Sequence, residues 1–179
     1  NRRPGLYRSN YSFMHLLGYE SVWYEEALGK LKEQVIEVPD LVVLATDNRE
    51  DAIHISKINA EAAGVENLIR FSVCDFEETE VPPGPGVIYF NPEYGERMGE
   101  TSELEGIYAR LGDFMKKKCQ GYIGYIFTGN LDLAKKIGLR ASRRIEFFSA
   151  KLDCRLLEYE LYAGTKRKED SPIPNSPMP

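Results

Sequence analysis

The chain of 179 residues carries a net charge of −5, and 42% of its residues are hydrophobic and 28% charged. This composition is ordinary for a soluble globular protein of one domain, and it excludes collagen-like, disulfide-rich and membrane-spanning classes. The acidic balance argues against a surface that binds RNA by electrostatic attraction alone. The three cysteines are widely spaced and form no CxxC pair, which indicates a reduced, cytoplasmic protein without a metal site.

Apolar periodicity predicts that the first half of the chain alternates between helices and strands. We expect helices over residues 21–36 and 50–63, and strands over residues 41–46 and 69–74. The second helix should turn Ile55, Ile58 and Ala62 toward the core, because these residues share one face. Gly64 follows this helix at the position of a C-cap glycine.

The second half continues the alternation after a break rich in proline and glycine at residues 82–86. We expect strands over 87–90 and 121–127, a helix opening at residue 102, a short helix over 130–137, and two β-rich runs within 142–163. The long helix carries an apolar stripe of Leu104, Tyr108, Leu111 and Met115. Residues 164–179 predict a disordered tail, which leaves residues 1–163 as the folded part. Alternating strands and helices indicate an α/β fold with a doubly wound sheet.

The most informative segment, residues 86–99, reads GVIYFNPEYGERMG. Its apolar strand ends in Asn91, Pro92, Glu93 and Tyr94, at the sheet edge where open α/β folds bind ligands. The side-chain oxygen of Asn91 and the carbonyl of Pro92 can accept both hydrogens of an exocyclic amine. Tyr94 offers a ring on which a base can stack. The alternative is a structural turn, because Asn-Pro and Tyr-Gly dipeptides commonly interrupt regular elements.

This segment resembles the Asn-Pro-Pro-Tyr motif of class I S-adenosylmethionine-dependent amino-methyltransferases. The extension GERMG makes it similar to the THUMP-associated RNA methyltransferases, particularly the ribosomal RNA guanine-N2 enzymes. The resemblance implies that Asn91, Pro92, Glu93 and Tyr94 form the catalytic set for methylating the exocyclic amine of guanine in RNA. Glu93 stands where the family usually has proline. This change loosens the loop and places a carboxylate, which can hydrogen-bond a guanine edge, beside the expected base.

The resemblance assigns the S-adenosylmethionine site to the ends of neighbouring strands. In the family, the position of Asp47, here followed by Asn48, binds the cofactor ribose. The position of Asp75 receives the adenine amino group, the neighbouring side chain, here Phe76, packs on the adenine ring, and Asn91 completes the set. Each aspartate has a structural alternative, because Asp47 can cap the following helix and Asp75 can be a turn residue.

The resemblance extends to about residue 162 and implies a Rossmann-like class I methyltransferase sheet with helices on both faces. Such a sheet has its first strand at the centre, between the second and fourth, and this strand ends in a glycine-rich turn that cradles the methionine part of the cofactor. No such segment occurs in this sequence, so we expect the C-terminal portion of a longer catalytic domain. Strands 41–46 and 87–90 should then pair directly, leave a gap, or borrow a strand from another polypeptide, which leaves an oligomer open.

The family implies an RNA partner, expected to be ribosomal, bound through a separate RNA-binding module on the N-terminal side; no membrane partner is expected. We interpret the basic runs 116–118 and 143–144 as solvated faces, because the chain is acidic. Residues 128–130 and 151–157 also resemble family segments, and we interpret them as fold markers. Two other functions stay open: adenine-N6 methylation of DNA or RNA, which uses a similar tetrad, and a non-catalytic remnant or binding module.

Overall fold

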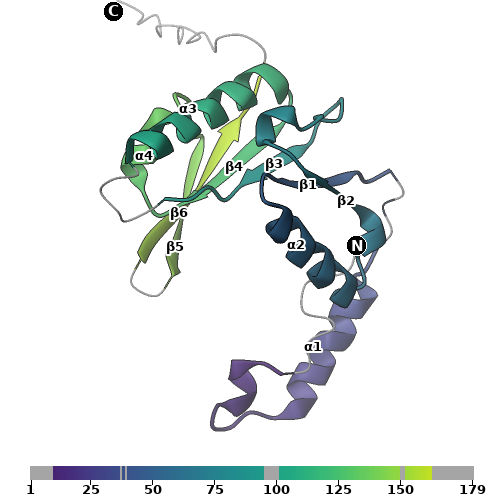
Figure 1. The fold of residues 1–179 in the computed structure, drawn as a ribbon. Coiled ribbons are helices and arrows are strands. Elements are labelled where there is room, and N and C mark those ends of the chain that lie inside the picture. Colours follow the sequence, from purple (N-terminus) through teal and green to yellow (C-terminus); the bar gives the residue numbers. More distant parts are fainter. Residues whose placement is uncertain (1–9, 37, 39, 95–100, 150–151, 163–179) are drawn as a thin grey trace, which may run out of the picture. The chain divides into compact units, whose positions relative to one another are not determined.

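The computed structural model describes residues 10–36, 38, 40–94, 101–149 and 152–162. The chain forms two compact units, an N-terminal unit of Asn1–Glu80 and a C-terminal unit of Val81–Pro179. Figure 1 shows the helices and strands of both units. The predicted tail of residues 164–179 and the GERMG extension of residues 95–99 lie outside the described residues.

The N-terminal unit is built around a two-stranded parallel sheet. In chain order its elements are η1 (Ser12–His15), α1 (Ser21–Glu33), β1 (Val43–Asp47), α2 (Glu50–Ala62), η2 (Glu66–Leu68), β2 (Ile69–Val73) and η3 (Phe76–Glu78). The register of β1 and β2 runs from Val43 opposite Ile69 to Asp47 opposite Val73. Helix α2 connects the two strands and packs against both. The predicted helices and strands of this half are therefore confirmed, with ends that move by up to three residues.

Helix α2 buries a different face from the one predicted. Its buried residues are Ile53 and Ala60, whereas Ile55 and Ile58 are 55% and 51% exposed. Residues two positions apart in an α-helix are rotated by about 200° about its axis. Ile55 and Ile58 therefore lie on nearly the opposite side of α2 from Ile53 and Ala60. The helix thus has two apolar stripes, and the small sheet covers only one. At its C-terminus the prediction holds, because Gly64 has a φ of 64° and its N–H donates to the Glu61 carbonyl at 2.8 Å.

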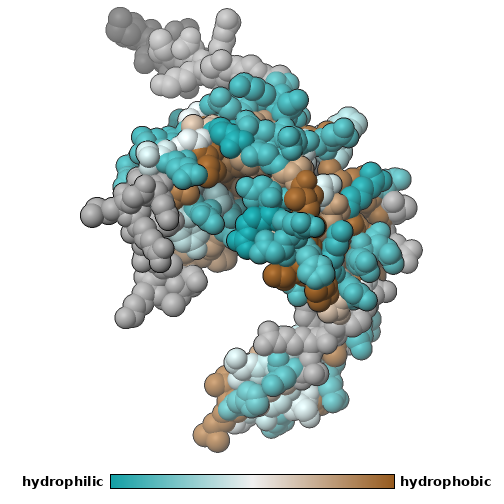
Figure 2. Space-filling model, viewed as in Figure 1, coloured by the Kyte–Doolittle hydropathy of each residue, from teal (hydrophilic) through white to brown (hydrophobic). Residues whose placement is uncertain are grey.

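The segment before β1 holds few buried side chains. No described residue of η1 or α1 is fully buried. The rings of Tyr11 and Phe13 stack at a centroid distance of 5.2 Å, and the ring of Tyr24 lies 5.9 Å from that of Phe13. Leu16 and Leu17 nevertheless stay on the surface, where hydrophobic residues appear at the lower end of Figure 2. This part of the unit is held by contacts among aromatic rings rather than by a closed core.

The C-terminal unit contains a four-stranded mixed sheet in the order β3-β4-β6-β5. Its elements are β3 (Val87–Phe90), α3 (Thr101–Lys118), β4 (Ile123–Thr128), α4 (Leu131–Lys136), β5 (Arg143–Ser149) and β6 (Leu152–Glu160). Strands β3 and β4 are parallel, and β6 runs antiparallel to both β4 and β5. The two predicted β-rich runs are therefore the closing hairpin of this sheet.

Helix α3 supplies much of the core of the C-terminal unit. The predicted stripe of Leu104, Tyr108, Leu111 and Met115 is buried, with at most 6% of any of these residues exposed. Helices α3 and α4 lie side by side over the four-stranded sheet (Figure 1). A regular apolar stripe along a long helix thus predicted the buried face correctly.

Among the described residues, β1 and β3 are each paired on one side only. Within the N-terminal unit β1 pairs with β2, and within the C-terminal unit β3 pairs with β4. The three arrangements expected between β1 and β3 stay predictions. The α/β class is confirmed. The open edges belong to the two strands between which the family resemblance places the absent first strand.

Candidate active site

The Asn91–Tyr94 motif directly follows β3, at the carboxyl end of the parallel pair β3–β4. Asn91 and Glu93 are exposed, whereas Pro92 and Tyr94 are half-buried. No hydrogen bond of the described structure engages the Asn91 side chain. An unengaged amide at this edge leaves its oxygen available to accept a hydrogen bond from a ligand. The arrangement does not match a turn in which the asparagine side chain bonds to its own backbone.

The ring of Tyr94 lies against the main chain that follows β4. A Cβ atom placed on Gly129 would lie 3.0 Å from Cε2 and 3.1 Å from Cδ2 of Tyr94. The same position would be 3.5 Å from the sulfur of Cys154, which belongs to β6. Tyr94 and Cys154, which are distant in the sequence, therefore both lie close to Gly129.

A buried polar pair stands beside this contact. The hydroxyl groups of Tyr108 and Thr128 are 2.8 Å apart, and both residues are fully buried. Burial raises the pKa of Tyr108, the hydrogen bond to Thr128 lowers it, and the neighbouring Tyr94 raises it further. Burial also raises the pKa of Tyr159 to about 12. Tyr108 and Tyr159 are therefore both uncharged at neutral pH. The hydrogen bond between Tyr108 and Thr128 fixes the chain at Thr128.

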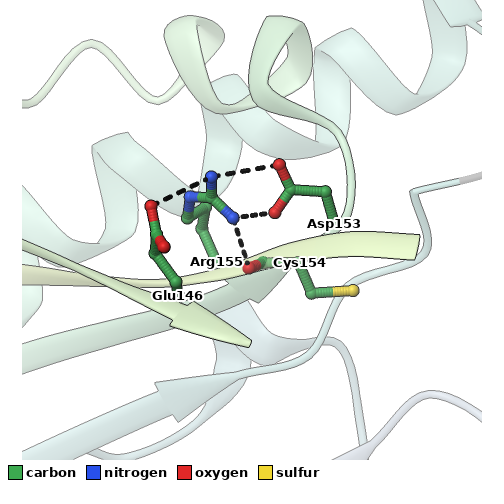
Figure 3. Close-up of polar contacts among 4 residues, drawn as sticks. All are labelled: Glu146, Asp153, Cys154 and Arg155. Carbon is green, nitrogen blue, oxygen red and sulfur yellow. Dashed lines mark hydrogen bonds and ion pairs between the residues drawn. The ribbon is translucent and has the colours of Figure 1, made fainter. Parts of the chain in front are cut away.

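The closing hairpin carries an ion-pair cluster around Arg155 (Figure 3). The guanidinium pairs with both oxygens of Asp153 and lies 3.4 Å from a carboxylate oxygen of Glu146, and it donates to the Cys154 carbonyl at 3.0 Å. The Arg155 side chain is only 16% exposed. Figure 3 shows the sulfur of Cys154 directed away from the guanidinium, as alternation along a strand requires. The ion pairs hold the Arg155 side chain on one face of β6. The side chain of Cys154, the preceding residue, therefore points to the other face, toward Gly129.

Asp47 ends β1 with an exposed carboxylate. Its Oδ1 accepts the backbone N–H of Arg49 at 2.8 Å, which is the bond of an Asx turn. Helix α2 begins at Glu50, and its N-cap is Arg49 without a side-chain capping bond, so the alternative in which Asp47 caps this helix is wrong. The guanidinium of Arg49 is held by Asp51 and lowers the pKa of that carboxyl. Asn48 beside Asp47 is exposed.

Asp75 caps the short 3₁₀ helix η3. Its Oδ1 accepts the N–H of Glu77 at 2.9 Å, and its own N–H donates to Glu78 at 3.3 Å, which completes a capping box. The turn role considered for Asp75 is therefore observed. Phe76, the first residue of η3, is half-buried. The capping bonds hold the Asp75 carboxylate in place just after β2.

The predicted site residues therefore divide between the two units. Asp47 and Asp75 follow neighbouring parallel strands, and the Cys74 N–H donates to the Asp47 carbonyl at 3.0 Å. Asn91 and Tyr94 belong to the C-terminal unit. Within the described ranges, no group of three or more His, Cys, Asp or Glu side chains could hold a metal ion. No helix in the described part is long and apolar enough to cross a membrane.

Sequence reasoning missed the residues that support Tyr94. Thr128 and Cys154 were interpreted only as fold markers, and Tyr108 only as part of an apolar stripe. The contacts among them depend on β4 lying between β3 and β6, which the local sequence does not reveal. The available signal was the small residue at position 129, directly after a strand and between two hydrogen-bonding side chains.

Residues 1–158 match the family model described as RMKL-like, methyltransferase domain. A ribosomal RNA large subunit methyltransferase K/L from Syntrophotalea carbinolica is 32% identical over 98% of this chain and 25% of its own length. A solved structure of a possible methylase from Clostridium difficile 630 has a TM-score of 0.72 at 22% identity, over 92% of this chain and 43% of that one. A solved structure described as a putative methyltransferase complexed with SAH has a TM-score of 0.69 at 18% identity, over 90% of this chain and 42% of that one. The chain thus spans about a quarter of the length of the ribosomal RNA methyltransferase that it matches.

Proposed function

Because the chain belongs to the RMKL-like methyltransferase domain family, we propose that it transfers a methyl group from S-adenosylmethionine to the exocyclic N2 amine of guanine in RNA. The K/L relative is named for large-subunit ribosomal RNA, which supports ribosomal RNA as the substrate. The observation that carries the proposal is an exposed Asn91 with an unengaged amide, three residues before a ring that packs against Gly129. This pairing of a free acceptor with a supported aromatic ring suits a planar base that carries an amino group.

The chemistry needs little acid–base catalysis from the protein. S-adenosylmethionine supplies a methyl group that is already activated by its positively charged sulfur, so most of the rate comes from positioning the amine nitrogen. The side-chain oxygen of Asn91 and the carbonyl of Pro92 accept the two amine hydrogens and hold the nitrogen lone pair out of conjugation with the ring. The same acceptors stabilise the positive charge that develops on this nitrogen. The Tyr94 ring fixes the plane of the base.

Asp47 fits the ribose of the cofactor. Its carboxylate is exposed, and only Oδ1 is engaged by the turn, which leaves Oδ2 for a ribose hydroxyl. Asp75 and the half-buried Phe76 would hold the adenine, with the capping role of Asp75 keeping its carboxylate in place. The SAH complex of a protein with a similar fold supports the choice of cofactor.

Glu93 favours guanine over adenine at this site. The Watson–Crick edge of guanine presents two neighbouring donors, N1–H and the N2 amine, whereas adenine presents an acceptor at N1. An exposed carboxylate next to Asn91 can accept from the guanine N1–H, but it would face the lone pair of adenine N1. The carboxylate at position 93 therefore adds a contact to guanine that the proline of the family motif does not provide.

The test is methyl transfer by the 179-residue chain to ribosomal RNA, with the modified nucleoside identified by mass spectrometry. We expect N2-methylguanosine from the unchanged chain, and a loss of about a hundredfold in turnover for Asn91→Ala. Asn59→Ala, a substitution at an exposed position of α2, is the matched control and should keep full turnover. Glu93→Pro should reduce the preference for guanine.

Three results would count against the proposal. N6-methyladenosine as the product would favour the adenine alternative. Calorimetric binding of S-adenosylmethionine without transfer to any RNA would favour a binding module. Unchanged turnover of Asn91→Ala would remove the role of the amide, whichever base is methylated.

A further inference from the structure

We propose that Gly129 is a positioning residue that sets the place of the Tyr94 ring, and that a side chain at position 129 slows methyl transfer by displacing this ring. This inference rests on the proposed function, because Tyr94 is there the platform for the base. The role is new for residues 128–130, which the sequence marked only as part of the fold. It follows from the convergence of the motif loop and strand β6 on Gly129, at the end of β4.

The contact between Gly129 and the ring is too tight for a methyl group unless the ring yields by a few tenths of an ångström. A Cβ atom at position 129 would lie 3.0 Å from Cε2 and 3.1 Å from Cδ2 of Tyr94. Carbon atoms that are not bonded prefer a separation of about 3.5–4.0 Å. The ring would therefore have to retreat by roughly half an ångström to accommodate alanine. A larger side chain would also meet the sulfur of Cys154, which is 3.5 Å from the Cβ position.

The backbone at Gly129 is held on both sides, so the ring has to move instead. Thr128 is fully buried, its hydroxyl is 2.8 Å from that of Tyr108, and it also accepts the Asn130 N–H at 3.0 Å. Asn130 is the N-cap of α4, and its side chain accepts the backbone N–H groups of Asp132 and Leu133 at 3.0 and 3.1 Å. The two neighbours of Gly129 thus belong to fixed structure. Tyr94, by contrast, is half-buried on a loop.

The conformation of Gly129 does not itself demand glycine. Its φ lies outside the left-handed region that five other described glycines adopt, so alanine is compatible with the local backbone. The cost of a side chain at this position therefore falls on the contact with Tyr94. This separates a positioning role from the common structural use of glycine in turns.

The experiment compares Gly129→Ala with Gly106→Ala in the 179-residue chain. Gly106 lies in α3 of the same unit, and a Cβ placed there would have nothing within 4 Å. The Tyr94 ring is observed by NMR on protein with ¹³C-labelled tyrosine, and its signals are assigned with Tyr94→Phe. Turnover on RNA and the KM for S-adenosylmethionine are measured in parallel.

We expect the Tyr94 ring signals to shift in Gly129→Ala and to stay in place in Gly106→Ala. The kcat for RNA should fall by about tenfold in Gly129→Ala, with the KM for S-adenosylmethionine unchanged, because only the base platform has moved. When Tyr94 is already alanine, adding Gly129→Ala should change kcat by less than about twofold, since no ring is left to displace.

Ring signals that stay in place in Gly129→Ala would overturn the inference, and so would shifted signals with an unchanged kcat. A full additional loss in the Tyr94→Ala background would also overturn it, because the effect would then not pass through the ring. If the unchanged chain transfers no methyl group to any RNA, the proposed function fails, and the ring signals alone decide whether Gly129 positions Tyr94.

Discussion

The two units show that predicted elements do not by themselves make a closed core. The N-terminal unit has two strands, and its only fully buried hydrophobic residues in the described part are Ile53 and Ala60. The C-terminal unit has four strands, and its buried residues include a whole stripe of α3. A small sheet becomes stable alone through about three strands with a hydrophobic face, or through packing against a helix. The C-terminal unit has both, whereas the described part of the N-terminal unit has only two strands and α2 packed against them.

Amide hydrogen exchange should show the largest difference between the units. Strand β4 is paired on both sides, by β3 and β6, so its amides should exchange only when the whole C-terminal unit unfolds. Strand β1 is paired on one side and should exchange through local opening. We expect exchange at residues 43–47 to be about a thousandfold faster than at residues 123–128, which corresponds to roughly 4 kcal/mol in the free energy of opening. Exchange measured by NMR gives both rates in one sample.

Strand β3 is the internal control for this experiment. It pairs with β4 on one side and has an open edge on the other, so its exchange should lie between that of β1 and that of β4. Equal protection of β1 and β4 would contradict the comparison. It would mean that the open edge of β1 is covered in solution, for instance by a second copy of the chain.

The next largest effect should come from a side chain added at Gly112, where α3 packs closely against the end of α4. A Cβ placed on Gly112 would lie 1.8 Å from the carbonyl oxygen of Ile137, where α3 meets the end of α4. We expect Gly112→Ala to lower the unfolding free energy of this unit by about 3 kcal/mol, because neither backbone can yield without separating the helices. Urea denaturation followed by circular dichroism measures the change.

The matched variant Gly106→Ala lies in the same helix, and its Cβ would meet nothing within 4 Å. It should stabilise the helix by up to about 1 kcal/mol, because alanine is the better helix former. If both variants lost the same stability, the loss would belong to the helix and not to the contact with Ile137.

The elements of the fold could be predicted from the sequence, but the faces they bury could be predicted only in part. The stripe of α3 was predicted because a long helix repeats its apolar positions over several turns. Helix α2 was misjudged at Ile55 and Ile58, because two stripes have helical spacing and the small sheet covers only the one with Ile53. Which stripe a helix buries depends on the strands beside it, and local periodicity does not contain that information.

The candidate site shows the same division between local and distant information. The motif of Asn91 to Tyr94 is continuous in the sequence, so its residue types could be recognised without a structure. Its support is discontinuous, because Gly129 lies against the Tyr94 ring, and Cys154 lies near Gly129, only through the strand order β3-β4-β6. A contact set by strand order depends on pairings between distant segments, and these follow from the whole sheet.

Alkaline pH should lower the unfolding free energy of the C-terminal unit. Complete burial of Cys119 raises the pKa of its thiol from 9.0 to about 11. Between these values the folded state keeps the proton that the unfolded state loses, so the unfolding free energy falls as the pH rises and is flat again above about 11. The loss should be about 3 kcal/mol for this thiol, because each pKa unit corresponds to about 1.4 kcal/mol. Urea denaturation of the reduced protein at about pH 8 and at successive higher pH values would measure it.

Cys119→Ala should remove the decline that begins near pH 9, even if the smaller side chain lowers stability at every pH. A later decline should persist in this variant, because burial also raises the pKa of Tyr159, from 10.0 to about 12. Cys74→Ala, at a half-buried position in the N-terminal unit, should leave the pH profile of the C-terminal unit unchanged. A decline near pH 9 that survives Cys119→Ala would show that another group titrates there. The close packing that distinguishes the C-terminal unit would then not be the cause of its sensitivity to alkali.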